Sequence, residues 1–400
     1  MANRNRVIYQ SEALYVGPTD TSSNNLGCRI AHPSTTINQL QRVQSANYSF
    51  TIDRQDVNQF GELAAIDRVI LSAPTVALDF SYLVANMSNE KDLGFHISDG
   101  DWVSSISGIL NKTADEKCYF IRTTAEGSDA LGVAYNAADQ AVIGIGNGYI
   151  TSYTTEASVG NFPTASVNVE ALNMRVYSGS TSVSGQNIPA VIPSTGTADS
   201  ANTFHLPDVV SHTASATGGK TDAGATGQDV TSVLRPGDIS FGLNTVTDAG
   251  VESAWTGDTG ATIEHPDVNV GSAKIQSYNI SFDLGRTPLE KLGSKFAFAR
   301  EIDFPVTITI SIEAQVSDLT AGGLSTLVAN DVNYNLYVYL QDPRSTIDDY
   351  NAVYHVKRAK LDSQEFSSAI GDNKSVTLNF SAQVGGPNQN TVGFFMSGVV

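Results

Sequence analysis

The chain has 400 residues and a formal net charge of −18, and this acidity excludes a surface built to grip nucleic acid. Phosphate binding depends on Lys and Arg, and the chain has 23 of these against 41 acidic residues. A large net charge also keeps proteins in solution, which on composition alone is the simpler interpretation. No apolar run approaches the length of a membrane span and no apolar signal region follows the first residues, so we expect a soluble chain made in a cytoplasm.

The residue usage is typical of β proteins. Only 16% of the residues are charged, while Ser, Thr, Val, Gly and Asn are abundant. The length suits two or three domains, each with its own core. Cys28 and Cys118 are expected to remain free thiols, because two cysteines in a chain of this length form a disulfide less often.

Alternating apolar and polar residues predict strands throughout the first half of the chain. The clearest alternation places Tyr48, Phe50 and Ile52 on one side of a half-buried strand. Between residues 87 and 148 the alternation weakens, which we interpret as inserted material. The predicted strands of this half are residues 7–17, 39–53, 75–84, 118–124, 141–153 and 159–176.

Residues 178–227 are rich in Ser, Thr, Gly and Ala, and this composition predicts a linker or a surface insertion. Two stretches elsewhere suggest helices. Residues 56–65 predict a short helix or a loop, and residues 287–301 predict a short helix with Pro288 in its first turn. The predicted strands of the second half are residues 305–316, 335–341, 350–361 and 375–384.

The stretch from Lys274 to Gly293 repeats the stretch from Arg42 to Gly61 at a shift of 232 (276 − 44). A further segment repeats at a shift of 211 (371 − 160), where residues 159–171 match residues 370–382. This agreement exceeds what composition gives, so we infer the tandem duplication of one domain. The identical pairs of the first match are Gln44/Gln276, Ser45/Ser277, Asn47/Asn279, Ser49/Ser281, Phe50/Phe282, Arg54/Arg286 and Gly61/Gly293.

The predicted fold is therefore mainly β, with each copy a β-sandwich or barrel that carries a short flanking helix. We place the first unit at residues 1–177, a linker or surface insertion at residues 178–231 and the second unit at residues 232–400. The two cores are expected to superpose and to face apolar interiors. The predicted core residues of the repeat are Phe50, Phe282, Val76, Leu78, Phe80, Ile308, Ile310 and Ile312.

The sequence predicts no enzyme, no cofactor and no metal site. Its six histidines are scattered without metal-ligand spacing, and no serine-hydrolase, zinc-protease or phosphate-loop motif occurs. Arg54 and Arg286 are the charged residues repeated within the core window. We expect each to contact a turn or stack on a neighbour, and an inter-subunit contact is the alternative.

Four runs of the first unit, taken in their order, resemble the major tail tube proteins of long-tailed, siphovirus-type bacteriophages. The runs are RVIYQSEALYVGP, QSANYSF, FGELAAIDRVILSAPTVALDFSYLVAN and GNGYITSYTTEASVGNFPTASVNVEALN. The resemblance implies a virion protein made in the host bacterial cytoplasm, whose subunits close into rings around a continuous inner sheet. Stacked rings would form the tail's conduit for DNA ejection, with a tape measure protein and a tail terminator as partners, no membrane, and double-stranded DNA passing without specific binding.

Most tube proteins of this family carry one such fold and form hexameric rings, whereas this chain resembles the kind with a duplicated fold. Two copies in one chain supply two positions of a ring, so we expect homotrimeric rings of pseudo-sixfold symmetry, stacked helically. The wall of the bore should be acidic or uncharged polar, with residues 178–227 on the outside. The alternatives are another ring-forming tail component (a hub or tail-completion protein), a capsid-surface or adhesin-type β protein and, last, an acidic hydrolase.

Overall fold

The computed structural model is mainly β, which confirms the predicted fold class. None of the helices in the part of the chain that it describes is long and apolar enough to cross a membrane. The described residues are 12–18, 38–70, 75–98, 103–110, 115–124, 130, 140–171, 173–178, 188–189, 203–204, 233–246, 274–289, 292, 299–315, 333–341, 350–367, 375–387, 389 and 391–400.

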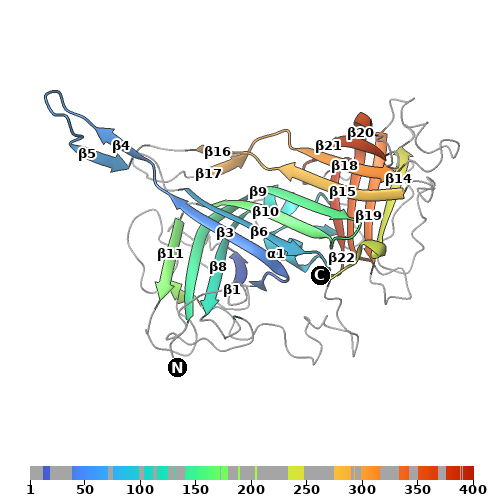
Figure 1. Ribbon diagram of the computed structural model, residues 1–400, viewed down its shortest axis with the longest axis horizontal. Coiled ribbons are helices and arrows are strands. Elements are labelled where there is room, and N and C mark those ends of the chain that lie inside the picture. The colour runs from blue at the N-terminus through green and yellow to red at the C-terminus, as the bar shows by residue number, and fades with distance from the viewer. Residues whose placement is uncertain are drawn as a thin grey trace.

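One large antiparallel sheet runs through the molecule (Figure 1). Its central strands are, in order of pairing, β3 (Val43–Thr51), β6 (Thr75–Leu83), β10 (Thr164–Ala171), β9 (Gln140–Ser158), β15 (Lys274–Asp283), β18 (Thr307–Gln315), β21 (Ser375–Gln383), β20 (Tyr350–Ser367), β19 (Asn333–Gln341) and β14 (Ile239–Val246). Several strands branch from this path. They are β8 (Glu116–Thr124) on β9, β1 (Glu12–Pro18) on β8, β2 (Asn38–Gln39) on β1, β11 (Asn173–Ser178) on β9, β22 (Gly393–Gly398) on β20 and β7 (Ile97–Ser98) parallel to β22.

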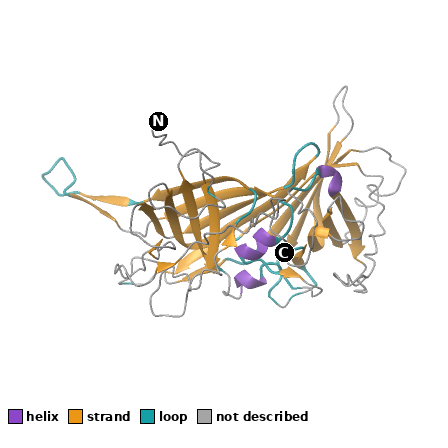
Figure 2. Ribbon diagram, turned by 90° about the horizontal axis from the view of Figure 1, so that it is seen from below, coloured by secondary structure: helices purple, strands orange, loops and turns teal. Residues whose placement is uncertain are grey.

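Three two-stranded hairpins and a few short helices complete the described chain. The hairpins are β4 (Arg54–Val57) with β5 (Asp67–Ile70), β16 (Arg286–Leu289) with β17 (Ala299–Ile302), and β12 (Ile188–Pro189) with β13 (Thr203–Phe204). The helices are α1 (Ser88–Leu93), α2 (Ser107–Leu110) and a 3-10 turn at Pro236–Asp238. Figure 2 shows α1 and α2 next to each other near the C-terminus, where the Met87 amide bonds the Val399 carbonyl.

The same order of strands occurs in both halves of the chain. The first half pairs in the order β3-β6-β10-β9-β8-β1 and the second in the order β15-β18-β21-β20-β19-β14. Backbone irregularities recur at matched places as well. The extra residues of the bulges are Gln44 and Gln276 at a shift of 232, and Thr151 and Asp362 at a shift of 211.

A left-handed backbone position repeats too, at Asn147 with φ 56° and Arg358 with φ 57°, again 211 residues apart (358 − 147). These matches agree with a duplication, which stays a prediction, as do the boundaries at residues 1–177, 178–231 and 232–400. Within residues 178–231 the structure describes the end of β11 and the hairpin of β12 and β13, and the remainder lies outside the described residues.

The two halves meet edge to edge through β9 and β15. Their ladder runs from Ser158 opposite Ser277 to Ser152 opposite Asp283. It joins four strands of each half into one layer, which we call the eight-strand layer: β3, β6, β10, β9, β15, β18, β21 and the second part of β20. β9 and β20 are long, and their first parts extend beyond the layer. The first part of β9 pairs with β8 and β11, and the first part of β20 pairs with β19 and β22. These two sheets cover one side of the layer.

The core lies between the eight-strand layer and these covering sheets. Burial alternates along β6 and β18, as expected for strands with one covered face. The six aliphatic and aromatic residues predicted on these two strands are each at most 2% exposed; they are Val76, Leu78, Phe80, Ile308, Ile310 and Ile312.

The predicted burial of the two repeated phenylalanines is right for Phe282 and wrong for Phe50. Phe282 is 2% exposed, and the centroid of its ring lies 5.6 Å from that of Tyr153 and 5.5 Å from that of Phe394. Phe50 is 40% exposed. The cause is position, since β15 is paired on both edges, whereas among the described strands β3 pairs with β6 alone and ends the layer.

The helix predicted at residues 287–301 is also wrong. Its ends, Arg286–Leu289 and Ala299–Ile302, pair with each other as β16 and β17, and Pro288 stands opposite Arg300 in that hairpin. The hairpin is favoured because it brings two arginines to acidic partners on the body of the protein, described below. Of the stretch between the hairpin strands, only Leu292 is among the described residues.

The expectation of free thiols is wrong for Cys118, which is fully buried in β8 and disulfide-bonded. Cys28 lies outside the described residues. Separation along a sequence does not say whether two thiols meet in the fold, because a disulfide depends on how close the Cβ atoms lie in space.

The different surroundings of the repeated phenylalanines predict different effects on stability. Phe282→Ala should lower the free energy of unfolding by about 3–5 kcal/mol, because it leaves a cavity in a closed core. Phe50→Ala should cost about 1 kcal/mol or less in the unassembled chain. Urea denaturation of both variants in dilute solution measures the difference, and equal losses would contradict the assignment of β3 to an open edge.

Candidate functional site

The candidate functional site is the uncovered side of the eight-strand layer, which we call the polar face. Side chains alternate between the two sides of each strand, so the residues between the core positions share this face. They are Ser45, Asn47, Ser49 and Thr51 of β3; Thr75, Ala77, Asp79 and Ser81 of β6; Ser166, Asn168 and Glu170 of β10; Ser152, Thr154, Glu156 and Ser158 of β9; Ser277, Asn279, Ser281 and Asp283 of β15; Thr307, Thr309, Ser311, Glu313 and Gln315 of β18; Ser375, Thr377, Asn379, Ser381 and Gln383 of β21; and Ser363, Glu365 and Ser367 of β20.

Short polar side chains on this face bond one another across the strands. The bond of Asn279 Nδ2 to Glu156 Oε2, 3.2 Å long, crosses the junction between the halves. Others lie within each half: Asn47 to Asp79 at 2.8 Å, Ser45 to Ser81 at 2.7 Å, Asn168 to Ser152 at 2.7 Å, Ser281 to Thr309 at 2.8 Å and Asn379 to Ser363 at 2.9 Å. Such pairs stabilise a solvated sheet without apolar contacts.

The charge of the polar face is acidic. The acidic residues among the positions named above are Asp79, Glu156, Glu170, Asp283, Glu313 and Glu365, and none of those positions is Lys or Arg. Three basic residues lie at its border: Lys274, which stands opposite Gln315 at the start of β15; Lys360, opposite Ser381 beside the bulge in β20; and Arg300, whose Nη1 lies 2.6 Å from Glu170 Oε1. A face of this composition repels a phosphate backbone.

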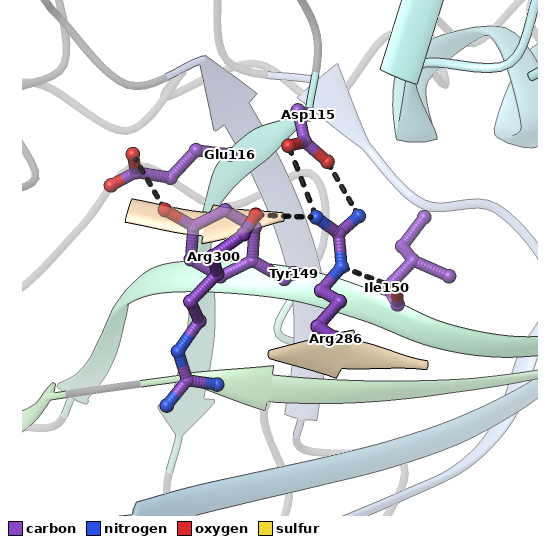
Figure 3. Close-up of polar contacts among 6 residues, drawn as sticks. All are labelled: Asp115, Glu116, Tyr149, Ile150, Arg286 and Arg300. Atoms are coloured by element: carbon purple, nitrogen blue, oxygen red, sulfur yellow. Dashed lines mark hydrogen bonds and ion pairs between the residues drawn. The ribbon is translucent and has the colours of Figure 1, made fainter. Parts of the chain in front are cut away.

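A group of charged residues, which we call the clamp, fastens the second half to the first (Figure 3). Arg286, the first residue of β16, forms a two-pronged ion pair with Asp115, with Nη2–Oδ1 at 2.5 Å and Nη1–Oδ2 at 3.1 Å. Its Nε donates to the Ile150 carbonyl at 3.4 Å, and its guanidinium lies 4.9 Å from the centre of the Tyr149 ring. The Arg286 side chain is 2% exposed, so this is a buried, oriented pair.

Arg300 extends the clamp on the other strand of the hairpin. Besides its ion pair with Glu170, its guanidinium lies 5.9 Å from the Tyr149 ring centre. The Tyr149 hydroxyl donates to Glu116 Oε2 at 3.2 Å, and burial raises the pKa of the Glu116 carboxyl above its usual range. The hairpin of β16 and β17 is therefore held to the body by both of its strands.

The repeated arginines have different surroundings. Arg54 begins β4 and is exposed, so the structure does not bring it to a site like that of Arg286. Arg68, the counterpart of Arg300 at a shift of 232, pairs with Asp56 within the same hairpin at 2.5 Å. In the second half Lys360 replaces Tyr149 and Ser381 replaces Glu170 at a shift of 211, so the partners of the clamp are not repeated.

The hairpin of β4 and β5, with its tip, forms an arm that extends beyond the end of the sheet (Figure 1). Every residue of both strands is exposed. The exposed apolar residues of the arm are Val57, Phe60, Leu63, Ile66, Val69 and Ile70, and Phe60 and Leu63 are exposed as fully as in an extended chain, at 105% and 111%. The loop alternative predicted at residues 56–65 is right for residues 58–65, which form the tip, but the prediction missed that the arm projects from the sheet. A two-stranded hairpin is marginal in water, so the arm requires a partner surface.

A buried polar cluster lies on the core side of the junction. Glu90 of α1 is 0% exposed, and its Oε1 accepts bonds from the Tyr82 hydroxyl at 2.9 Å and the Tyr153 hydroxyl at 3.0 Å. The Tyr153 hydroxyl lies 3.3 Å from that of Tyr354. Burial raises the pKa of Glu90 to about 7, although these hydrogen bonds and the charge of Arg42 favour its ionised form. The cluster thus ties α1 to strands of both halves.

The described residues contain no group of three or more His, Cys, Asp and Glu side chains arranged to hold a metal ion. His355 is fully buried, with its ring 3.9 Å from that of Tyr337, and burial lowers the pKa of His355 well below its usual value. A buried, stacked imidazole of this kind is a structural residue.

Comparisons with known proteins give distant structural likeness. No protein-family model and no curated protein matches the chain. Among solved structures, a chain from the tail of an empty GTA particle with C6 symmetry is similar, at 12% identity and a TM-score of 0.23 over 38% of this chain and 94% of that chain. A chain from the sixfold-symmetrised baseplate of the anti-feeding prophage (AFP) has 13% identity and a TM-score of 0.23 over 30% of this chain and 77% of that chain. Likeness at this TM-score carries no argument about function.

The clamp predicts unequal effects for the two repeated arginines. Arg286→Ala leaves the Asp115 carboxylate buried without its partner, so the free energy of unfolding should fall by about 3–5 kcal/mol. Arg54→Ala, the matched control, should change it by about 0.5 kcal/mol or less, because Arg54 is exposed. Urea denaturation measures both changes, and a similar small loss in both variants would contradict the clamp.

The cluster around Glu90 predicts a pH-dependent stability. Its pKa in the folded chain, about 7, lies above the ordinary value of 4.5, so the folded state holds the proton more tightly than the unfolded state. Stability contributed by the protonated carboxyl is therefore complete below about pH 4.5 and is lost as the pH rises through 7. A shift of this size corresponds to a loss on the order of 3 kcal/mol.

Glu90→Gln should remove this dependence, because glutamine keeps an oxygen acceptor for the two tyrosines and does not titrate. Urea denaturation at pH 5 and pH 8 would compare it with the unaltered chain. The matched control, Glu156→Gln, lies on the polar face and should follow the unaltered chain. Parallel stability curves for Glu90→Gln and the unaltered chain would overturn the role given to Glu90.

Proposed function

We propose that the chain is a structural virion protein of a siphovirus-type tail, which polymerises as stacked rings into the tail tube. The observation that carries this proposal is the eight-strand layer. Its two halves already pair edge to edge through β9 and β15, while β3 at one end, and β20 beyond Ala359 at the other, form a ladder with a single described strand.

Unpaired strand edges favour association between chains, and natural proteins leave them exposed where they serve assembly. The contact between the two halves is head-to-tail, because it joins different strands, β9 of one half and β15 of the other. When such a contact is repeated, the subunits close into a ring if the rotation from one to the next divides a full circle. Two halves occupy two positions, so three chains would complete a ring of pseudo-sixfold symmetry. The resemblance of the first unit to tail tube proteins supports the same assembly, and the duplication explains why the chain departs from six identical subunits.

In such a ring the polar face would line the bore. Its acidic and uncharged residues suit a conduit through which double-stranded DNA passes without specific binding. Lys274, Lys360 and Arg300 lie at its border, and Arg300 is neutralised by Glu170. The covering sheets and helices would form the outer surface. The long connection at residues 178–231 would lie outside as well.

The arm would connect successive rings. It extends beyond the end of the sheet, and its apolar residues need a surface that the described part of its own chain does not provide (Figure 1). A tape measure protein in the bore and a tail terminator at the end of the tube are the partners that this role requires. The chain would be made in the host bacterial cytoplasm and act in the virion.

Electron microscopy of the purified chain, combined with native mass measurement, tests the proposal. We expect tubes built from rings of three chains. Isolated rings alone would favour a hub or tail-completion protein, and monomers alone would favour a capsid-surface or adhesin-type protein. Six chains per ring would overturn the assignment of two ring positions to each chain.

A variant of the arm separates ring formation from stacking. Phe60→Ser combined with Leu63→Ser should give rings without tubes, because it removes the apolar tip and leaves the eight-strand layer intact. The matched control is Leu292→Ser, which alters a residue that is 103% exposed on the counterpart hairpin and should leave tubes unchanged. Tubes of normal length from the double variant would contradict the stacking role.

A further inference from the structure

We propose that neighbouring chains join through an antiparallel ladder in which β3 of one copy pairs with residues 363–367 of β20 of the next, with Ser49 opposite Glu365. The inference rests on the proposed function, since it concerns the contact that closes the ring. It adds the partner strand and the register, and both follow from this chain alone.

The template is the contact between the halves. In that ladder Ser281 of β15 lies opposite Thr154 of β9, and Phe282 lies opposite Tyr153. The second part of β9 has β10 on its other side, just as the second part of β20 has β21. A second copy is therefore the partner that presents a matching strand, β3, to the edge of β20 that no described strand covers.

The matched bulges convert the template into a register. Gln44 and Gln276 fix a shift of 232 between β3 and β15, and Thr151 and Asp362 fix a shift of 211 between β9 and β20. Each residue pair of the β15/β9 ladder is converted by subtracting 232 from the β15 residue number, which gives a residue of β3, and adding 211 to the β9 residue number, which gives a residue of β20. The result is the set of contacts between chains. They are Asn47 with Ser367, Tyr48 with Phe366, Ser49 with Glu365, Phe50 with Gln364, and Thr51 with Ser363.

Side-chain chemistry supports this register over its neighbours. A slip by one residue would turn the apolar side of β3 to the polar face. In the proposed register Tyr48 lies opposite Phe366, which is 54% exposed, so the contact between chains gains an aromatic pair. The junction within the chain has its aromatic pair, Phe282 with Tyr153, at a different position of the ladder. Phe50, 40% exposed in the single chain, would be covered by the next copy.

The two kinds of junction differ beside the ladder. Within the chain, Arg286 and Arg300 bind Asp115 and Glu170 around Tyr149. Between chains, Arg54 and Arg68 would meet Lys360 and Ser381 at the matched positions, and a lysine repels an arginine. The junction between chains therefore has the ladder and the aromatic pair without the clamp. The arm of β4 and β5 beside this junction would therefore be free of the clamp and could contact the next ring.

Engineered disulfides test the register directly. Ser49→Cys combined with Glu365→Cys places two thiols opposite each other, at a Cα separation that a disulfide accepts. The variant is assembled under reducing conditions and then oxidised. We expect covalent dimers and trimers on denaturing gels, absent from each single variant. Thr51→Cys combined with Ser363→Cys tests the same register a second time, in case the first pair disturbs assembly.

The control pair is Ser49→Cys combined with Ser367→Cys. It lies on the same face but two residues out of register, about 7–8 Å apart, and should cross-link poorly. Efficient linking of the control pair with none in either matched pair, in rings seen by microscopy, would overturn the register and leave the tube proposal standing. If the unaltered chain forms no rings at all, both proposals fall. Cross-linked species of six chains would retain the register and contradict the threefold ring.

Discussion

The ladder between β9 and β15 is the interaction on which the rest of the structure depends. It turns two four-strand sheets into one layer, and it places Tyr153 of the first half against Phe282 of the second. Glu90 and Arg286 act at the same junction, one on its core side and one beside its end. Without the ladder, β15 would be a second open edge, and Phe282 would lose its contact with Tyr153.

Much of the fold could be predicted from the sequence, because apolar and polar residues alternate along strands that bury one face. The cores of β6 and β18 were found in this way, and the internal match located their common place in the two halves. Phe50 was mispredicted because its burial depends on what lies beyond a strand edge, which local sequence does not encode. The helix predicted at residues 287–301 failed for a related reason: Arg286 finds Asp115, 171 residues away, and that pair favours a hairpin.

Part of the candidate site could be predicted from the sequence. Ser, Thr and Asn at every second position of the repeated strands predicted a polar side, and the excess of acidic residues predicted its sign. The clamp and the Glu90 cluster were missed, because each joins residues of both halves and neither has a local motif. The arm was missed because residues 56–65 favour a short helix or a loop, and nothing local to that stretch indicates a hairpin that projects beyond the sheet. The bulges at Thr151 and Asp362, on which the proposed register between chains rests, cannot be detected from the alternation of apolar and polar residues.

The proposed duplication, followed by divergence, would give the two hairpins opposite uses. Both hairpins begin with an arginine that follows a repeated strand. Arg286 contacts Tyr149 and Asp115, whereas Arg54 is exposed. A clamp repeated at every junction would hold all hairpins against the body and leave none to reach another ring. In the proposed ring every second hairpin would lack the clamp, because Lys360 and Ser381 stand where the first half has Tyr149 and Glu170. The proposed assembly would therefore have clamped junctions within chains and unclamped junctions between them, with arms alternating around the ring.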